Sequence, residues 1–492
     1  MSDRATSRRV DHAGLDALLA ELDDELGARG PRFRRLARAI AAAVERGVLP
    51  RGARLPAERR LAAALAVSRG TVVAAYDELV AEGVVERRRG SGTYVLGPDT
   101  LGLPPGREGS ALVHRLVDRS RPAAASPAVV DLSLSVLGDA EGLPEVALTT
   151  ADLRATVPDT GYTPWGLPGL RAALARHVTG WGLPTGAEEV VVTSGAQQAL
   201  SAAAACWVRP GDLVAVDDPT YPGAIATFTA AGARLVPMAT DGGGVRPDEV
   251  ARALARRPAL VYLQSGPHSP TGAALAAGRR PAIADLVTAA RVPLVEDAAL
   301  ADLAWHLGPG PGAVPPVAAW CGDAAVALVG SLDKVLWGGL RVGFVRAPAP
   351  VALRFARVKA TNDLGSSAVG QLLAERLLAA GGPEFLDARR AELRARYEAL
   401  AGALRRRLPA WAWDEPAGGL STWVRLPGGA DATAFAQVAL RHGVAVATQA
   451  ALSCSGAHPD RLRLSFSAGP ADLVEGVARL ASAWEAYAPR LT

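Results

Sequence analysis

The stretch Val326-Ala-Leu-Val-Gly-Ser331-Leu-Asp-Lys334-Val-Leu-Trp-Gly-Gly-Leu-Arg341-Val-Gly343 decides the fold of the larger part of the chain. Its first residues form a β-branched run that predicts a buried strand. A lysine beyond a strand can lose its proton and attack an aldehyde cofactor, which an arginine cannot do. The flanking Ser331 and Arg341 can hold a phosphate. The sequence contains only two lysines, Lys334 and Lys359, so Lys334 is a candidate for this chemistry.

Similar short runs alternate with alanine-rich helical stretches from about residue 128 onward. They cover residues 189–193, 213–216, 259–263, 293–295, 326–329 and 342–345. This alternation predicts an α/β fold with a mostly parallel, doubly wound sheet. Ligands of such sheets bind beyond the carboxyl ends of the strands. We therefore expect the side chains that follow these runs to share one site.

Three further motifs follow such runs. Thr193-Ser-Gly-Ala-Gln-Gln198 opens a helix, whose free backbone N–H groups suit an anion. Asp217-Asp-Pro-Thr-Tyr221 places a tyrosine where it could stack on an aromatic ring. Asp297 ends a run with a carboxylate, which would keep a pyridine nitrogen protonated. Taken alone, Tyr221 could fill a core and Asp297 could cap a helix, but together the motifs put a phosphate site, a stacking ring and a pyridine partner beside the lysine.

Residues 128–492 resemble the type I pyridoxal-phosphate aminotransferases, including Tyr162-Thr-Pro-Trp-Gly-Leu-Pro-Gly-Leu-Arg and Leu462-Arg463-Leu-Ser-Phe. The resemblance implies a homodimer, a smaller C-terminal α+β subdomain and pyridoxal 5'-phosphate as cofactor. It also implies that Lys334 bonds to the cofactor and Asp297 faces the pyridine nitrogen. The other implied contacts are Tyr221 for ring stacking, Gly195, Ala196, Gln197, Ser331 and Arg341 for phosphate, Arg463 for an amino-acid carboxylate, and Tyr162 for the phosphate in the partner subunit.

Three positions depart from that family's pattern, and the first two argue against efficient transamination. Ser269 stands where an asparagine usually contacts the phenolic oxygen of the cofactor. After Asp297 the expected tyrosine is missing, because the chain reads Ala298-Ala299-Leu300. Asp333 precedes the lysine where serine is common, and a carboxylate there would disfavour a phosphate. We expect the cofactor to bind and transaminase turnover to be low, with an active amino-acid aminotransferase as the alternative.

Positive charge is concentrated near the front of the chain. Residues 31–97 hold thirteen arginines and six carboxylates, whereas residues 1–30 carry a net charge of −3. A basic segment in a chain of formal net charge +4 points to a polyanionic partner for that segment. Helical patterns at 33–46 and from Pro56, a third helix capped by Ser68 and a hairpin over 84–95 predict a winged helix-turn-helix. The start of the third helix would enter the major groove of DNA.

This segment resembles the GntR-type winged helix, through Leu55-Pro-Ala-Glu-Arg59, Val67-Ser-Arg-Gly-Thr71 and Arg89-Gly-Ser-Gly-Thr-Tyr-Val95. The resemblance, with the basic hairpin, assigns DNA contacts to Arg59, Ser68, Arg69, Gly70, Thr71, Arg88, Arg89 and Gly90. One contact that is usual in the family is absent, since Val73 stands where a basic residue often follows.

The whole chain resembles the MocR subfamily of bacterial regulators. Its expected parts are an acidic extension (1–30), a DNA-binding domain (31–97), a linker (98–127) and an aminotransferase-like domain (128–492). Expected partners are double-stranded DNA, a small amine or amino-acid effector and a second copy of the chain. Three scattered cysteines and the lack of an apolar leader or membrane span favour the cytoplasm. No metal site is expected, because the seven histidines are scattered.

Overall fold

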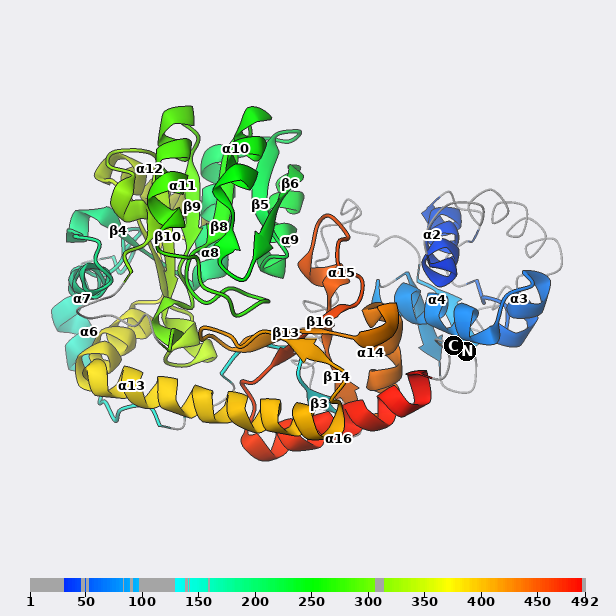
Figure 1. Ribbon diagram of the computed structural model, residues 1–492. Helices are drawn as coiled ribbons and strands as arrows, with labels where there is room; N and C mark the ends of the chain where they lie inside the picture. Colours follow the sequence, from blue (N-terminus) through cyan, green and yellow to red (C-terminus); the bar gives the residue numbers. More distant parts are fainter. Residues whose placement is uncertain are drawn as a thin grey trace, which may run out of the picture. The chain divides into compact units, whose positions relative to one another are not determined.

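The computed structural model describes residues 31–45, 49, 53–82, 84–88, 92–96, 129–137, 140, 142–157, 160–305 and 314–488. The chain divides into two compact units, Met1–Ala124 and Ala125–Thr492 (Figure 1). The acidic extension and the linker lie outside the described residues. None of the described helices combines the length and the apolar character needed to cross a membrane.

The first unit is the predicted winged helix-turn-helix. Its elements are α2 (Arg32–Glu45), α3 (Glu58–Ala64), α4 (Arg69–Ala81) and the antiparallel strands β1 (Val85–Arg88) and β2 (Gly92–Val95). Apolar residues of the three helices form its core, where Leu36, Ile40, Leu61, Val72, Tyr76 and Leu79 are at most 1% exposed. The Tyr76 hydroxyl donates to the Pro56 carbonyl at 2.8 Å, which ties α4 to the chain that leads into α3.

The turn between α3 and α4 leads into the predicted Ser68 cap. Ala66 adopts a left-handed backbone conformation with φ 49°. The Ser68 side chain then accepts the Thr71 N–H at 3.1 Å and caps α4. Such a cap satisfies one of the free N–H groups at a helix start. The first residues of α4 are thereby held at the surface of the unit.

The second unit is built on a mixed, mostly parallel sheet in the order β4-β11-β10-β9-β8-β5-β6-β7. Only β11 and β7 run antiparallel to their neighbours. The strands are β4 (Val190–Thr193), β5 (Leu213–Asp218), β6 (Arg234–Asp241), β7 (Gly244–Val245), β8 (Leu260–Gln264), β9 (Leu294–Asp297), β10 (Val326–Ser331) and β11 (Gly343–Arg346). All six predicted runs are strands, and the predicted doubly wound architecture is confirmed.

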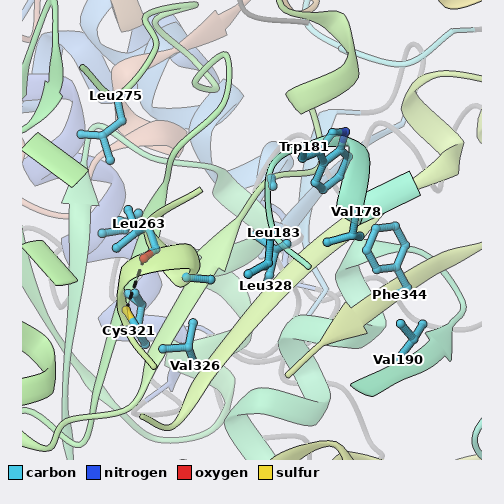
Figure 2. Packing of buried hydrophobic residues seen from close by; sticks show 14 of the residues in the cluster. Val178, Trp181, Leu183, Val190, Leu263, Leu275, Cys321, Val326, Leu328 and Phe344 are labelled. Atoms are coloured by element: carbon cyan, nitrogen blue, oxygen red, sulfur yellow. Dashed lines mark hydrogen bonds between the residues drawn. The ribbon is translucent and has the colours of Figure 1, made fainter. Parts of the chain in front are cut away.

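Helices cover both faces of this sheet. One face packs against α7 (Pro168–Gly180), α10 (Pro247–Ala255), α11 (Arg279–Ala290) and the start of α13 (Ala368–Arg407); the other packs against α8 (Ala196–Trp207), α9 (Pro222–Ala230) and α12 (Ala349–Asn362). Neighbouring residues of a strand therefore enter different cores: Val190 and Leu328 join the first, and Val191 and Val329 the second. Figure 2 shows the first core, where Trp181 and Phe344 lie close together. Burial on both faces explains why the strands read as continuous apolar runs.

The C-terminal part forms the smaller α+β subdomain. A four-stranded sheet in the order β12-β13-β16-β15 and a two-stranded pair, β14 with β3, pack with α14 and α16. The bounds are β3 (Val130–Asp131), β12 (Ala412–Trp413), β13 (Ser421–Arg425), β14 (Val444–Ala445), β15 (Ala447–Thr448), β16 (Arg461–Ser465), α14 (Ala432–Arg441), α15 (Gln449–Leu452) and α16 (Pro470–Tyr487). The long α13, yellow in Figure 1, bends at Gly382-Pro383 and packs on both sheet-based cores.

Short elements complete the second unit. They are α6 (Thr150–Thr156) and the 3-10 turns η1 (Ala187–Glu189), η2 (Ala301–Leu303), η3 (Val317–Trp320), η4 (Leu332–Lys334), η5 (Gly338–Leu340) and η6 (Pro427–Gly429). Two of them matter for the site, because η4 follows strand β10 directly and contains Lys334, and η5 leads into Arg341.

Candidate cofactor site and nucleic-acid interface

Four strands of the large sheet end at the predicted cofactor site. Lys334 follows β10 in η4, Asp297 ends β9, Tyr221 follows β5 at the start of α9, and Gly195 follows β4 at the start of α8. The charges of Arg463, Asp333, Asp297 and Arg341 all act on Lys334. The structure thus brings together groups that lie up to about 270 residues apart in the sequence.

Lys334 has the electrostatic environment of a reactive amine. Its Nζ donates to the Ser135 carbonyl at 2.8 Å, and its side chain is half-buried. Burial and the positive charge of Arg463 lower its pKa from 10.5 to about 8, against the opposing charges of Asp333 and Asp297. A larger fraction of this amine is therefore neutral at pH 7 than in a fully solvated lysine, since each pKa unit is a tenfold change in the ratio of the two forms.

Asp297 is buried and held by two hydrogen bonds. Its Oδ2 accepts the Tyr262 hydroxyl at 2.8 Å, and its Oδ1 accepts the Ala299 N–H at 2.9 Å. Burial raises the pKa of Asp297, and the two hydrogen bonds counteract that rise. Sequence reasoning missed Tyr262. Its one signal is a tyrosine inside the otherwise apolar run of β8, which the structure pairs directly with β9.

A second buried carboxylate lies next to this pair. Asp217 accepts the Thr220 hydroxyl at 2.5 Å and the Gln264 N–H at 2.9 Å, and its Oδ2 is 3.2 Å from His268 Nε2. The negative charge of Asp217 also raises the pKa of Asp297, although its effect is smaller than those of burial and of the hydrogen bonds that Asp297 accepts. Sequence reasoning assigned no role to Asp217, because two of its three partners, Gln264 and His268, lie 47 and 51 residues further along the chain.

Tyr221 is tied to the start of α8. Its hydroxyl donates to Gln197 Oε1 at 3.1 Å, and the Gln197 amide donates to Thr227 Oγ1 at 2.7 Å. Burial raises the pKa of Tyr221 to about 12, and the negative charge of Asp297 acts in the same direction. The phenol therefore remains neutral and its ring is held in place.

We call the residues that are predicted to bind the phosphate the phosphate cup: Gly195, Ala196, Gln197, Ser331 and Arg341. Gly195 caps α8 with φ 82°, a conformation that favours glycine. A Cβ on Gly195 would lie 2.9 Å from Arg341 Nη2 and 2.6 Å from Asp333 Oδ2. Ser331 is 5% exposed, and Arg341 is exposed over 56% of its side chain. The phosphate cup thus has a helix start, a hydroxyl and a guanidinium, with one carboxylate beside them.

Arg463, the predicted partner of an amino-acid carboxylate, lies buried on β16. Its Nη1 donates to Ser269 Oγ at 3.2 Å, and its Nη2 donates to the Ser133 carbonyl. Its Nε is buried and has no hydrogen-bond partner among the described residues. Burial lowers the pKa of Arg463 to about 10, so it is still a cation at neutral pH. A buried cation with a free donor suits an anionic group.

Several of these residues fit pyridoxal 5'-phosphate. The amine of lowered pKa, the buried carboxylate, the held phenol and the helix start match the aldehyde, pyridine nitrogen, ring and phosphate of that group. Asp333 does not fit, because it adds a negative charge at the phosphate cup. Tyr162 is 63% exposed, and no hydrogen bond among the described residues joins its side chain to the site.

The predicted DNA-contacting residues of the first unit lie at its surface. Ser68, Arg69 and Gly70 are exposed at the start of α4, and Arg59 is exposed on α3. Thr71, in the first turn of α4, is partly buried. Arg88 ends β1, its side chain is not among those described, and Arg89 and Gly90 lie outside the described residues.

Sequence reasoning missed the acidic partner of the recognition helix. Arg69 Nη2 lies 3.0 Å from Glu58 Oε2, and Arg87 is 3.7 Å from the other oxygen of that carboxylate. The Arg87 guanidinium is also 2.5 Å from Asp77. Helices α3 and α4 and the first strand of the hairpin therefore share one charged network, which holds Arg69 before any DNA is bound.

Comparison with known families matches both units. Residues 33–95 match the family of bacterial regulatory proteins called gntR, and residues 127–480 match aminotransferase class I and II. The sequence is 30% identical to the probable rhizopine catabolism regulatory protein MocR of Rhizobium meliloti, over 67% of this chain and 68% of that protein. It is 29% identical to the HTH-type transcriptional regulator TauR of Rhodobacter capsulatus, over 93% of this chain and 97% of that protein.

Solved structures share the fold of the second unit. One is LysN, the α-aminoadipate aminotransferase of Thermus thermophilus, in complex with N-(5'-phosphopyridoxyl)-L-leucine. It superposes with a TM-score of 0.67 at 26% identity, over 80% of this chain and 99% of that chain. An aminotransferase fold thus follows a GntR-type domain in a single chain.

Proposed function

We propose that this chain, which belongs to the aminotransferase class I and II family and carries a GntR-family domain, is a DNA-binding transcription regulator like the MocR-like HTH-type regulators. Its larger domain binds pyridoxal 5'-phosphate and senses either this cofactor or an amino compound. The single observation that carries the cofactor half is the environment of Lys334. Lys334 is half-buried, its Nζ donates to the Ser135 carbonyl at 2.8 Å, and burial and the charge of Arg463 lower its pKa to about 8. This is the arrangement that an aldehyde cofactor requires.

Each group of the site then has a stated task. The bound cofactor supplies an aldehyde that captures amines and a ring that draws electrons. Lys334 contributes the neutral amine, and Asp297 accepts a hydrogen bond from the ring nitrogen. Tyr221 packs on the ring, the phosphate cup holds the phosphate, and Arg463 pairs with the carboxylate of an amino-acid effector.

Arg69 is the residue that we propose to read a base in the major groove, because α4 presents it at an exposed helix start. Arg59, Ser68 and Thr71 would bind phosphates and fix the register on the duplex. A homodimer would present two such helices and favour a paired operator. An effector can change DNA binding only as far as its affinity differs between two arrangements of the dimer.

An absorption spectrum of the purified chain with pyridoxal 5'-phosphate tests the cofactor half. A visible band that disappears in Lys334→Ala and persists in Lys359→Ala is expected, because the chain has only these two lysines. Borohydride reduction and peptide mapping would then locate the cofactor on the Lys334 peptide. If the band is absent from the parent chain, or persists in Lys334→Ala, the assignment of the site is wrong.

An amino-acid aminotransferase is the second candidate function. The buried Arg463 with its free Nε favours it, since that geometry would orient an amino-acid carboxylate. Ser269 and the Ala298-Ala299-Leu300 segment weigh against it, because they lack two groups that usually tune the cofactor. Turnover with amino acids and 2-oxo acids, measured on the loaded chain, distinguishes the two. Sustained release of product 2-oxo acid would favour the aminotransferase. A single stoichiometric reaction would favour the sensor.

A further inference from the structure

Asp333 places a carboxylate against the phosphate cup. The residue is 5% exposed, its Oδ1 accepts the Val342 N–H at 2.9 Å, and its Oδ2 accepts from Arg341 Nη1. The same Oδ2 would lie 2.6 Å from a Cβ on Gly195, the residue that caps α8. The carboxylate is thus fixed by a backbone N–H on one side and contacts both the start of α8 and Arg341 on the other.

Arg341 has both terminal nitrogens engaged in this arrangement. Its Nη1 donates to Asp333, and its Nη2 donates to the Ser194 carbonyl at 2.7 Å. The cation that the phosphate cup offers to a ligand is therefore already neutralised by an anion of the chain itself. The other charged or titratable groups around Asp333 are Lys334 on its own turn η4 and Tyr221 at the start of α9.

A cofactor phosphate in the phosphate cup would bring a second anion next to this carboxylate. Two adjacent anions in a poorly hydrated place raise the pKa of the weaker acid and favour its protonated form. Burial already raises the pKa of Asp333, although the charge of Arg341 opposes that shift. Once protonated, Asp333 can donate its O–H to a phosphate oxygen and releases Arg341 for the phosphate.

We propose that Asp333 makes the binding of a phosphate-bearing cofactor proton-coupled, so that the chain binds such a ligand more weakly as pH rises. Asp333 is then a specificity-determining residue that affects the binding of the phosphate group and not the binding of the aldehyde or the ring. This inference rests on the proposed cofactor site and adds its regulation by pH. It concerns a position at which this chain carries an acid where serine is common.

The direction of the effect follows from proton linkage. Below the pKa of Asp333 in the free chain, the residue is protonated with or without ligand, and its contribution does not depend on pH. Between that pKa and the higher pKa in the complex, binding takes up as much as one proton. Affinity for the phosphorylated ligand then falls by up to about tenfold per pH unit. The unphosphorylated aldehyde creates no second anion and lacks this dependence.

The test compares two ligands on the full-length chain. Dissociation constants for pyridoxal 5'-phosphate and for pyridoxal are measured at a series of pH values across the whole range in which the chain stays folded, because the linkage lies between the pKa of Asp333 in the free chain and its higher pKa in the complex. The proteins are the parent, Asp333→Asn, Asp333→Ser and Asp285→Asn, a control that removes an exposed carboxylate on α11. Asp333→Ser keeps an acceptor for the Val342 N–H and guards against misfolding of the asparagine variant. Titration of Lys334 affects both ligands alike, so the ratio of the two constants isolates the phosphate.

The ratio of the constant for pyridoxal 5'-phosphate to that for pyridoxal should rise with pH in the parent and in Asp285→Asn. In both Asp333 variants the ratio should rise less steeply, and the difference from the parent should be up to about tenfold in the ratio for each pH unit. Equal slopes in the parent and the Asp333 variants overturn the proposal and leave the cofactor site intact. Loss of the slope for both ligands also overturns it, because Asp333 would then act through Lys334. If neither ligand binds any of the proteins, the proposed cofactor site itself is wrong.

Discussion

Replacing Arg69 by alanine should weaken binding to specific DNA and relax the sequence preference at one base pair. Arg69 stands at the exposed start of α4, with 57% of its side chain exposed. Its guanidinium is held by Glu58, with the terminal nitrogen and Nε 3.0 and 3.3 Å from the same carboxylate oxygen. Contact with a guanine would require the guanidinium to turn its fork away from that oxygen.

The magnitude of the loss follows from these two interactions. A two-pronged contact between arginine and guanine contributes about 1–3 kcal/mol of discrimination. The ion pair with Glu58 is partly exposed, and such pairs contribute about 0.2–1 kcal/mol, which is given up on binding. With the middle of each range, about 2 and about 0.6 kcal/mol, the net loss in Arg69→Ala should be about 1.4 kcal/mol, or about tenfold in the dissociation constant.

The assay first identifies a binding sequence and then measures affinity for it. The parent chain selects duplexes from a randomised pool, and fluorescence anisotropy then measures binding to the selected sequence and to a scrambled one over a series of salt concentrations. Arg69→Lys keeps the charge without the planar fork, so it should retain affinity for scrambled DNA and lose discrimination. Arg252→Ala is the matched control, because it removes an exposed arginine from α10 of the other unit.

Three outcomes would refute the reasoning. Equal binding of the selected sequence by Arg69→Ala and the parent would mean that Arg69 does not contact the DNA. An equal loss on selected and scrambled DNA would make Arg69 a phosphate contact that carries no sequence information. A binding constant of the parent that does not change with salt would remove the DNA interface as a whole, since phosphate contacts release counterions.

Two further predictions concern the larger unit. The rate at which Lys334 combines with pyridoxal should rise with pH and be half-maximal near pH 8, because burial lowers the pKa of Lys334 to about 8 and only the neutral amine attacks. Stopped-flow absorbance measures this rate, and a midpoint near pH 10.5 would instead show a fully solvated amine. Tyr262→Phe should lower the free energy of unfolding of the cofactor-free unit by about 1–3 kcal/mol, because Asp297 Oδ2 loses a buried hydrogen-bond donor. Urea unfolding measures this change, and an unchanged unfolding midpoint would show that Asp297 does not depend on the Tyr262 hydroxyl.

The local parts of the fold could be predicted from the sequence. The apolar runs of the large sheet are strands, and the Ser68 cap starts α4 where the sequence places it. These features depend on residues within one turn or one strand of each other, so neighbouring side chains are enough to specify them. The positions of Lys334 and Asp297 at strand ends follow in the same way, because each ends or directly follows an apolar run.

Interactions between distant segments could not be predicted in this way. Tyr262 contacts Asp297 because β8 and β9 are neighbours in the sheet, and Glu58 contacts Arg69 across the turn between α3 and α4. The strand order does not follow the order along the chain, so no periodicity in the sequence reveals which strand ends meet. Sequence reasoning therefore named the groups that follow the strands and missed their partners.

The sequence by itself determined which residue types stand at the ends of the strands and at the start of the recognition helix, because strand and helix patterns are local. Only the tertiary structure decided their charge state and pairing. Burial beside Arg463 lowers the pKa of Lys334, and the close approach of η4 to Arg341 pairs Asp333 with the residue expected to hold a phosphate. Desolvation and Coulomb interactions depend on distance in space and on access to water, and both arise only when the chain has folded.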